Sequence, residues 1–260
     1  MKRMRRGGLT VVAALALCGL TSAGASAALP ELGRCVPAST AKTGEYKGAR
    51  CLTPAAGTGN YNFLPGPGEK KKFVGTGSEA TLEMPGLKVS CAASTSEGEY
   101  TGAKTASVTL DLIGCSTVAA TSQLCQSNPV KAGEIETLPL EGEFGFIQSG
   151  QKPVVGLDVK RSPSLVTFTC GSPPETTTTT VVVEGSVIGK FAPNDAMVMD
   201  SKLSYKTSGG KQVVEHFEGG PTDTLSAKLI SGLTTTTEEA ALKLRLMEIA
   251  NEEPLEIKAK

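Results

Sequence analysis

Residues 106–113 read ASVTLDLI and residues 165–170 read LVTFTC, and these two stretches decide the fold class. In the first, Val108, Leu110 and Leu112 alternate with polar residues, the period of two that is typical of a half-buried strand. The other segments that read as strands are residues 78–84, 87–91, 142–148, 154–159, 178–191, 197–206, 212–217 and 224–230. Turn signals rich in glycine and proline separate them, for example at residues 85–86, 149–150 and 219–221.

Many short strands at nearly regular spacing predict an all-β, antiparallel, β-sandwich-like architecture over residues 69–260, as one unit or as two packed subdomains. Residues 28–68 are rich in Gly, Pro, Ala and Thr and show little periodicity. We therefore expect them to form an extended N-terminal arm.

Residues 238–250 form the one ambiguous element. Their composition suits a helix, whereas Leu242, Leu244 and Leu246 alternate with Lys243 and Arg245 as in a strand. We favour the strand and leave the helix open. The threonine run at 176–180 passes directly into three valines, so we expect it to begin a strand as well.

The N-terminus has the layout of a cleavable secretory signal peptide. Four basic residues at positions 2–6 precede an apolar stretch at 9–20 and a run of small residues. The small-x-small pattern at 25–27 predicts a signal peptide over residues 1–27 and a mature start at Ala28, with Leu29 as the alternative. The apolar stretch is shorter than the roughly 20 residues that span a bilayer, so no transmembrane anchor is expected. Lipidation at Cys18 is a rival reading that Leu17 disfavours.

Six cysteines follow the signal peptide, and an even number in an exported chain predicts a disulfide framework. They are Cys35, Cys51, Cys91, Cys115, Cys125 and Cys170. Six cysteines allow 15 connectivities. We expect 35–51 and 115–125 because each pair brackets a probable loop, and 91–170 because both end alternating segments. No C-x-x-C pair supports a zinc site.

Composition argues against several classes of function. Without its four N-terminal basic residues, the chain keeps 22 Lys and Arg against 26 Asp and Glu, a net charge near −4. That balance predicts no binding to nucleic acid. The single histidine, His216, shares a strand face with Glu218 if residues 212–217 form a strand, and two ligands do not make a metal site. We expect no cofactor, no metal and no catalytic residue.

Three aromatic residues of the N-terminal arm, Tyr46, Tyr61 and Phe63, are the least core-like aromatics in the chain. They are candidates for an exposed binding surface. The alternative is that they cover one edge of the core.

Several stretches together resemble a group of uncharacterised secreted proteins of actinobacteria. They are GEYKGARC (44–51), GTGNYNFLPGPG (57–68), GLKVSCAASTSEGEYTG (86–102), LDLIGC (110–115), GEIETLPLEGEFGFI (133–147) and VVEGSVIGKFAPND (182–195). The resemblance implies an exported, β-rich, cysteine-containing protein and brings no activity with it.

The sequence thus predicts a secreted, non-catalytic structural or interaction protein, either free or associated with the cell envelope. Its partner is open, with a cell-wall glycan or an envelope protein as candidates. A glycan- or ligand-binding β-sandwich module is the first alternative. A secreted hydrolase that uses paired carboxylates is the second.

Overall fold

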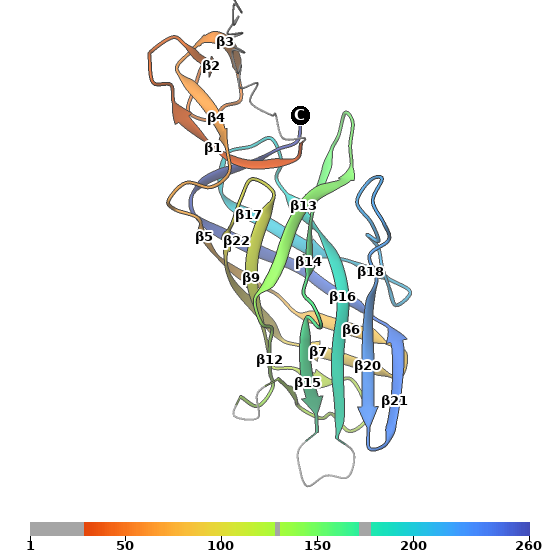
Figure 1. The fold of residues 1–260 in the computed structure, drawn as a ribbon. Coiled ribbons are helices and arrows are strands. Elements are labelled where there is room, and N and C mark those ends of the chain that lie inside the picture. Colours follow the sequence, from red (N-terminus) through yellow and green to blue (C-terminus); the bar gives the residue numbers. More distant parts are fainter. Residues whose placement is uncertain (1–28, 128–130, 172–177) are drawn as a thin grey trace, which may run out of the picture.

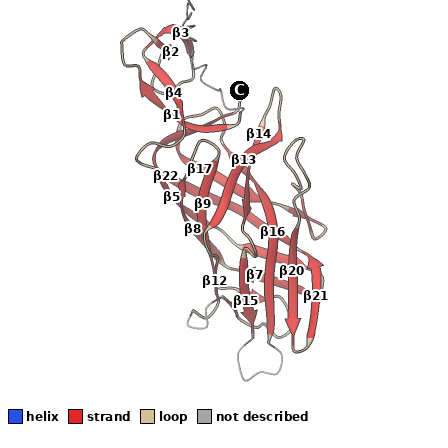
Figure 2. Cartoon of the chain, viewed as in Figure 1, coloured by secondary structure: helices blue, strands red, loops and turns tan. Residues whose placement is uncertain are grey.

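The computed structural model describes residues 29–127, 131–171 and 178–260, and within these ranges the chain is all β (Figure 2). The predicted signal peptide lies outside the described residues, as does Ala28. The strands assemble around a closed antiparallel barrel that carries extra strands at both of its ends (Figure 1). The expected sandwich is therefore replaced by a barrel.

Eight strands close the barrel by pairing in the cyclic order β5–β8–β9–β13–β14–β16–β17–β22–β5. They are β5 (Lys72–Gly77), β8 (Ala93–Tyr100), β9 (Thr105–Ile113), β13 (Leu140–Gln148), β14 (Val154–Lys160), β16 (Thr179–Ala192), β17 (Val198–Tyr205) and β22 (Ala241–Lys258). Alternation along each strand sends one set of side chains inward, as with Val155, Leu157 and Val159 of β14, which are all buried.

The residues predicted as an extended arm form a small sheet beyond one end of the barrel (Figure 1). Its strands are β1 (Glu31–Pro37), β2 (Gly44–Tyr46), β3 (Pro54–Gly59) and β4 (Tyr61–Pro65). The β1 strand also pairs with the end of β22, so the sheet is continuous with the barrel wall. The disulfide between Cys35 and Cys51 ties this sheet together, as the sequence predicted.

At the other end of the barrel, β9, β16 and β22 extend beyond the closed ring and pair with further strands. The strands there are β6 (Ala80–Met84), β7 (Leu87–Cys91), β10 (Ser116–Thr117), β11 (Cys125–Gln126), β12 (Glu134–Glu136), β15 (Val166–Cys170), β20 (Leu225–Ser231) and β21 (Thr234–Glu239). A separate short hairpin joins β18 (Thr207–Ser208) to β19 (Lys211–Gln212).

The long β16 strand belongs to both regions. Its first half pairs with β15 and β20, and its second half pairs with β14 and β17. Gly185, at the change of partners, has a φ of 104°, and a Cβ there would lie 1.9 Å from the Thr224 carbonyl oxygen. Only glycine fits such a position, which lets one strand serve two sheets.

Two of the three disulfides differ from the expected pairs. Cys91 is bonded to Cys115, and Cys125 to Cys170, so the predicted 91–170 and 115–125 pairs are wrong. Strand pairing explains the outcome, because Cys125 lies directly opposite Cys170 in the β11–β15 ladder. In the same way, Ser90 lies opposite Ser116 in the β7–β10 ladder, which brings the neighbouring Cys91 and Cys115 together. The predicted 115–125 pair rested on a loop and the predicted 91–170 pair on two strand ends, whereas the observed bonds follow the pairing of β7 with β10 and of β11 with β15.

The ambiguous segment is a strand. Residues 241–258 form β22, which pairs with β17 along one edge and with β6 and then β5 along the other. The segment 212–217 is mostly not a strand, since β19 ends at Gln212 and the following residues form a loop against the outer wall of the barrel. That segment was predicted as a strand, and the prediction is wrong.

Candidate functional site

The predicted surface residues Tyr46, Tyr61 and Phe63 lie in the N-terminal sheet, and the structure brings two of them onto one cation. The Lys258 Nζ lies 4.6 Å from the centre of the Tyr46 ring and 4.7 Å from that of Phe63. Tyr61 lies opposite Tyr46 in the β2–β4 ladder. All three side chains are half-buried. Tyr46 and Phe63 therefore hold a lysine of the same chain by cation–π contacts.

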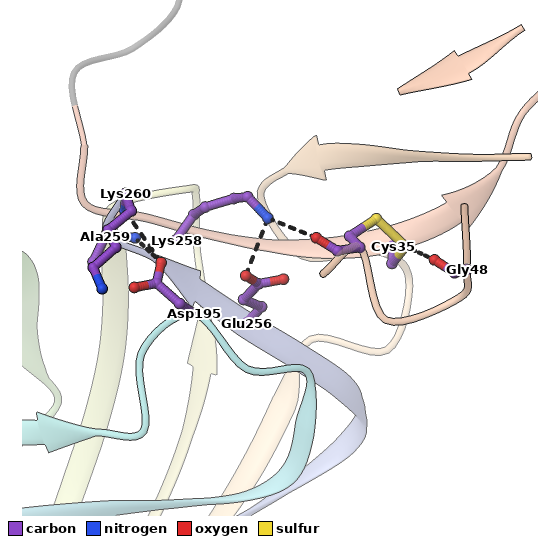
Figure 3. Close-up of polar contacts among 8 residues, drawn as sticks. Cys35, Gly48, Asp195, Glu256, Lys258, Ala259 and Lys260 are labelled. Carbon is purple, nitrogen blue, oxygen red and sulfur yellow. Dashed lines mark hydrogen bonds and ion pairs between the residues drawn. A yellow bond between two sulfur atoms is a disulfide. The ribbon is translucent and has the colours of Figure 1, made fainter. Parts of the chain in front are cut away.

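Polar contacts also hold the Lys258 ammonium group in place (Figure 3). Its ammonium group donates to the Cys51 carbonyl oxygen at 3.2 Å and to Glu256 Oε1 at 3.1 Å. The Glu256 side chain is 1% exposed, and its Oε2 has no hydrogen-bond partner. Burial raises the pKa of the Glu256 carboxyl, and Lys258 offsets part of the rise. The contacts fasten the N-terminal sheet to the end of β22.

Asp195 fixes the chain that follows β22. Its Oδ1 accepts the backbone N–H of Ala259 at 2.8 Å and of Lys260 at 3.1 Å (Figure 3). In the N-terminal sheet, Cys35 Sγ of the disulfide lies 3.6 Å from the Gly48 carbonyl oxygen. This end of the molecule is thus bound together by several short-range contacts, which suits a packing role for its aromatic residues.

His216 is exposed in the loop that crosses the outer wall of the barrel. Glu218 does not face it as a second ligand, because Glu218 Oε2 accepts the Ser149 backbone N–H at 2.6 Å. Throughout the described ranges, no three His, Cys, Asp or Glu side chains form a cluster suited to a metal ion. No helix within those same residues is long and apolar enough to cross a membrane.

Asp158 is a buried carboxyl that the sequence did not single out. It is 4% exposed, and its Oδ1 has no hydrogen-bond partner. Burial raises the pKa of Asp158 to about 7, with a further rise from the nearby Asp223 and a lowering contribution from Lys160. Lys160 Nζ lies 3.8 Å from Asp158 Oδ2 and 3.0 Å from Glu143 Oε2. The alternation of β14 predicts that Asp158 points away from the core, and nothing local predicts that it is covered.

A loop over residues 213–224 lies along the outer wall near this carboxyl. The Glu218 backbone N–H donates to the Phe146 carbonyl at 2.7 Å, and a Cβ on Gly145 would lie 2.6 Å from the Phe217 ring. Asp223, at the end of the loop, accepts a short hydrogen bond from the Ser186 hydroxyl. The loop brings Asp223 from outside the barrel to the neighbourhood of Asp158.

The outer wall also carries an open groove of about 610 Å³ across β5, β8, β9 and β22. Its lining includes the carboxylates of Glu97, Glu99 and Glu252. Glu252 accepts the Lys72 backbone N–H at 3.1 Å, and Glu99 forms an ion pair with Lys71. Two of the three carboxylates in this groove are therefore already engaged within the chain.

An apolar cavity of about 90 Å³ lies inside the molecule. Its lining runs from Phe73 of β5 and Phe191 of β16, within the barrel, to Cys91 of β7 and Phe168 of β15, among the extra strands. Almost all of the lining is carbon, supplied mainly by leucine and valine side chains of the alternating strands. Alternation predicts which side chains point inward but not whether they fill the space, so the pattern of residues does not predict this cavity.

A row of aromatic rings crosses the barrel beside the cavity. The ring centres of Phe73 and Tyr100 are 4.8 Å apart, those of Tyr100 and Phe144 are 6.3 Å apart, and those of Phe144 and Phe191 are 5.1 Å apart. The Tyr100 hydroxyl donates to Asn251 Oδ1 at 2.9 Å. The row fills the interior at this level, and the free space lies next to it.

Comparison with protein-family models, with curated proteins and with solved structures gave no match. A function must therefore be argued from the chemistry and geometry of the chain itself.

Proposed function

We propose that this chain is an exported, non-catalytic binding protein that holds a small apolar molecule inside its barrel. The observation that carries the proposal is the interior cavity of about 90 Å³, whose lining is almost entirely apolar. Eight-stranded barrels have interiors that side chains just fill or that hold one small ligand. Here the side chains leave space, and this favours the second of these uses.

The size of the cavity sets the size of the ligand. Protein interiors are close-packed, with few voids larger than a water molecule, whose share of liquid volume is about 30 Å³. At about 24 cal/mol for each Å³, leaving 90 Å³ empty costs the fold about 2 kcal/mol. An apolar ligand returns part of that free energy. The volume suits a noble-gas atom, one small ring or a short alkyl chain.

The location of the protein is consistent with this role. Three disulfides suggest an oxidising, extracellular environment. Of the functions that the sequence left open, a binding module gains most from the cavity. The prediction that Tyr46 and Phe63 form a binding surface has less support, because both rings lie against Lys258 of the same chain.

The test is to measure, by NMR titration, the binding of xenon and of benzene to the purified, secreted protein with its disulfides intact. Ala80 lines the cavity and is 1% exposed, so Ala80→Leu places new carbon atoms in the free space. We expect saturable binding to the unmodified protein and at least a tenfold loss in Ala80→Leu. Ala250→Leu is the matched control, because Ala250 is exposed on β22. Absence of saturable binding to the unmodified protein would refute the proposed function.

A further inference from the structure

Four hydroxyl groups stand out in the otherwise apolar lining of the cavity, and they differ in their partners. They belong to Ser96, Tyr100, Thr137 and Tyr205. Two have a hydrogen bond to a nitrogen or oxygen atom of the protein. Tyr100 donates to Asn251 Oδ1 at 2.9 Å, and Thr137 Oγ1 accepts the Leu110 backbone N–H at 2.9 Å.

The Ser96 hydroxyl has only a weak partner. Ser96 is 3% exposed, and its Oγ donates to the Met247 thioether sulfur at 3.2 Å. A thioether is a poor acceptor, and the acceptor capacity of the serine oxygen stays free. Ser94, two residues earlier on the same face of β8, donates instead to the Ser78 carbonyl oxygen at 3.2 Å. The hydrogen bond of the Ser96 hydroxyl is therefore weaker than that of the Ser94 hydroxyl, because its acceptor is a thioether and not a carbonyl oxygen.

Gly75 of β5 creates the space in which the Ser96 hydroxyl lies. A Cβ at Gly75 would come within 2.1 Å of Ser96 Oγ and 2.9 Å of Met247 Sδ. Because Gly75 has no side chain, the Ser96 hydroxyl and the Met247 sulfur both fit beside it in the interior.

The Tyr205 phenol also lines the cavity, and the residue is only 5% exposed. Its ring packs over Gly189, where a Cβ would lie 2.8 Å from the ring carbons. Burial raises the pKa of this phenol, so it stays protonated and able to donate.

We infer that the ligand is amphiphilic: an apolar body of about one ring, carrying one hydroxyl or carbonyl group that hydrogen-bonds to Ser96, Tyr205 or both. The inference rests on the proposed function and narrows its ligand class. A buried hydroxyl whose hydrogen bond goes to a poor acceptor, as at Ser96, favours a ligand that supplies a better partner over an analogue that does not. Apart from the hydroxyls of Tyr100 and Thr137, which are bonded within the protein, the remaining lining offers such a ligand only apolar contacts.

The experiment compares phenol with benzene as probes, because the two differ by one hydroxyl group. In the double variant Ser96→Ala/Tyr205→Phe, we expect the phenol Kd to rise roughly tenfold and the benzene Kd to stay the same or fall. The matched control is Ser94→Ala/Tyr61→Phe. It removes the same two kinds of hydroxyl from residues outside the cavity lining, so we expect the ratio of the two Kd values to be unchanged.

The outcomes separate this inference from the proposed function. If both probes bind the unmodified protein and the double variant leaves the ratio of their Kd values unchanged, the inference is wrong and the apolar cavity still binds. The same holds if the control shifts the ratio as much as the double variant. If neither probe binds the unmodified protein, the proposed function itself fails.

Discussion

Replacing Asp158 with asparagine tests the electrostatics of the barrel wall most directly. The carboxyl is 4% exposed, its Oδ1 lacks a hydrogen bond, and Asp223 lies near enough to raise its pKa further. Asparagine keeps the shape of the side chain and removes the titration. Any difference in pH dependence between the two proteins therefore reports Asp158 and its coupling to Asp223, because the remaining titrating groups are shared.

The magnitude follows from the shift in pKa. The carboxyl titrates at 3.8 in the unfolded chain and at about 7 in the fold. Between these values the folded state binds more protons, so the free energy of unfolding falls as the pH rises. Each pKa unit corresponds to 1.36 kcal/mol, and the shift of Asp158 costs the fold about 4 kcal/mol above pH 7. We expect Asp158→Asn to avoid this loss.

Urea unfolding of both proteins at half-unit steps from pH 4 to pH 8 measures the effect. The expected result is a stability advantage of Asp158→Asn over the unmodified protein that grows by about 4 kcal/mol from pH 4 to pH 8. Asp200→Asn, at an exposed position of β17, controls for the general effect of removing a charge. An advantage that does not change with pH, or one equalled by Asp200→Asn, would refute the reasoning.

Two further substitutions test other contacts by urea unfolding. Tyr100→Phe leaves Asn251 Oδ1 buried without its donor, and we expect a loss of about 1–3 kcal/mol; an unchanged midpoint would contradict the hydrogen bond. Lys258→Met leaves Glu256 buried without its cation, and we expect a loss of about 3 kcal/mol at pH 7 that shrinks at pH 4, where the carboxyl is protonated. The exposed Lys243→Met on the same strand should cost much less, and equal losses would argue against the ion pair.

The alternation of apolar and polar residues predicted the strands well where one face of the strand is buried and the other is exposed to solvent. Residues 106–113 became β9, and the disputed segment at 238–250 falls largely within β22, despite its helical composition. A segment that pairs along both edges gains more from its neighbours than from its own helix propensity. Residues 213–217 carried β-branched and aromatic residues as well, yet they lie on the barrel wall as a loop.

Closure of the barrel and the disulfide pattern were not predictable in this way. Both depend on which distant strands are neighbours, as when Phe73 of β5 pairs with Asn251 of β22. Alternation assigns a face to each side chain and says nothing about its cross-strand partner. The same limit applies to the candidate site. The cavity exists because side chains from many strands together do not fill the interior. Ser96 cannot be distinguished from other strand serines in the sequence, because its partner Met247 is known only from the structure.

The pairing of β22 has a consequence for the order in which this protein folds. Residues 241–258 follow every other barrel strand in the sequence, and they pair with β17, β5, β6 and β1. Until they are in place, β5 and β17 keep unpaired edges and the interior stays open along a seam. Closure therefore waits until β22 has been synthesised, and it joins residues far apart in the chain, which slows folding.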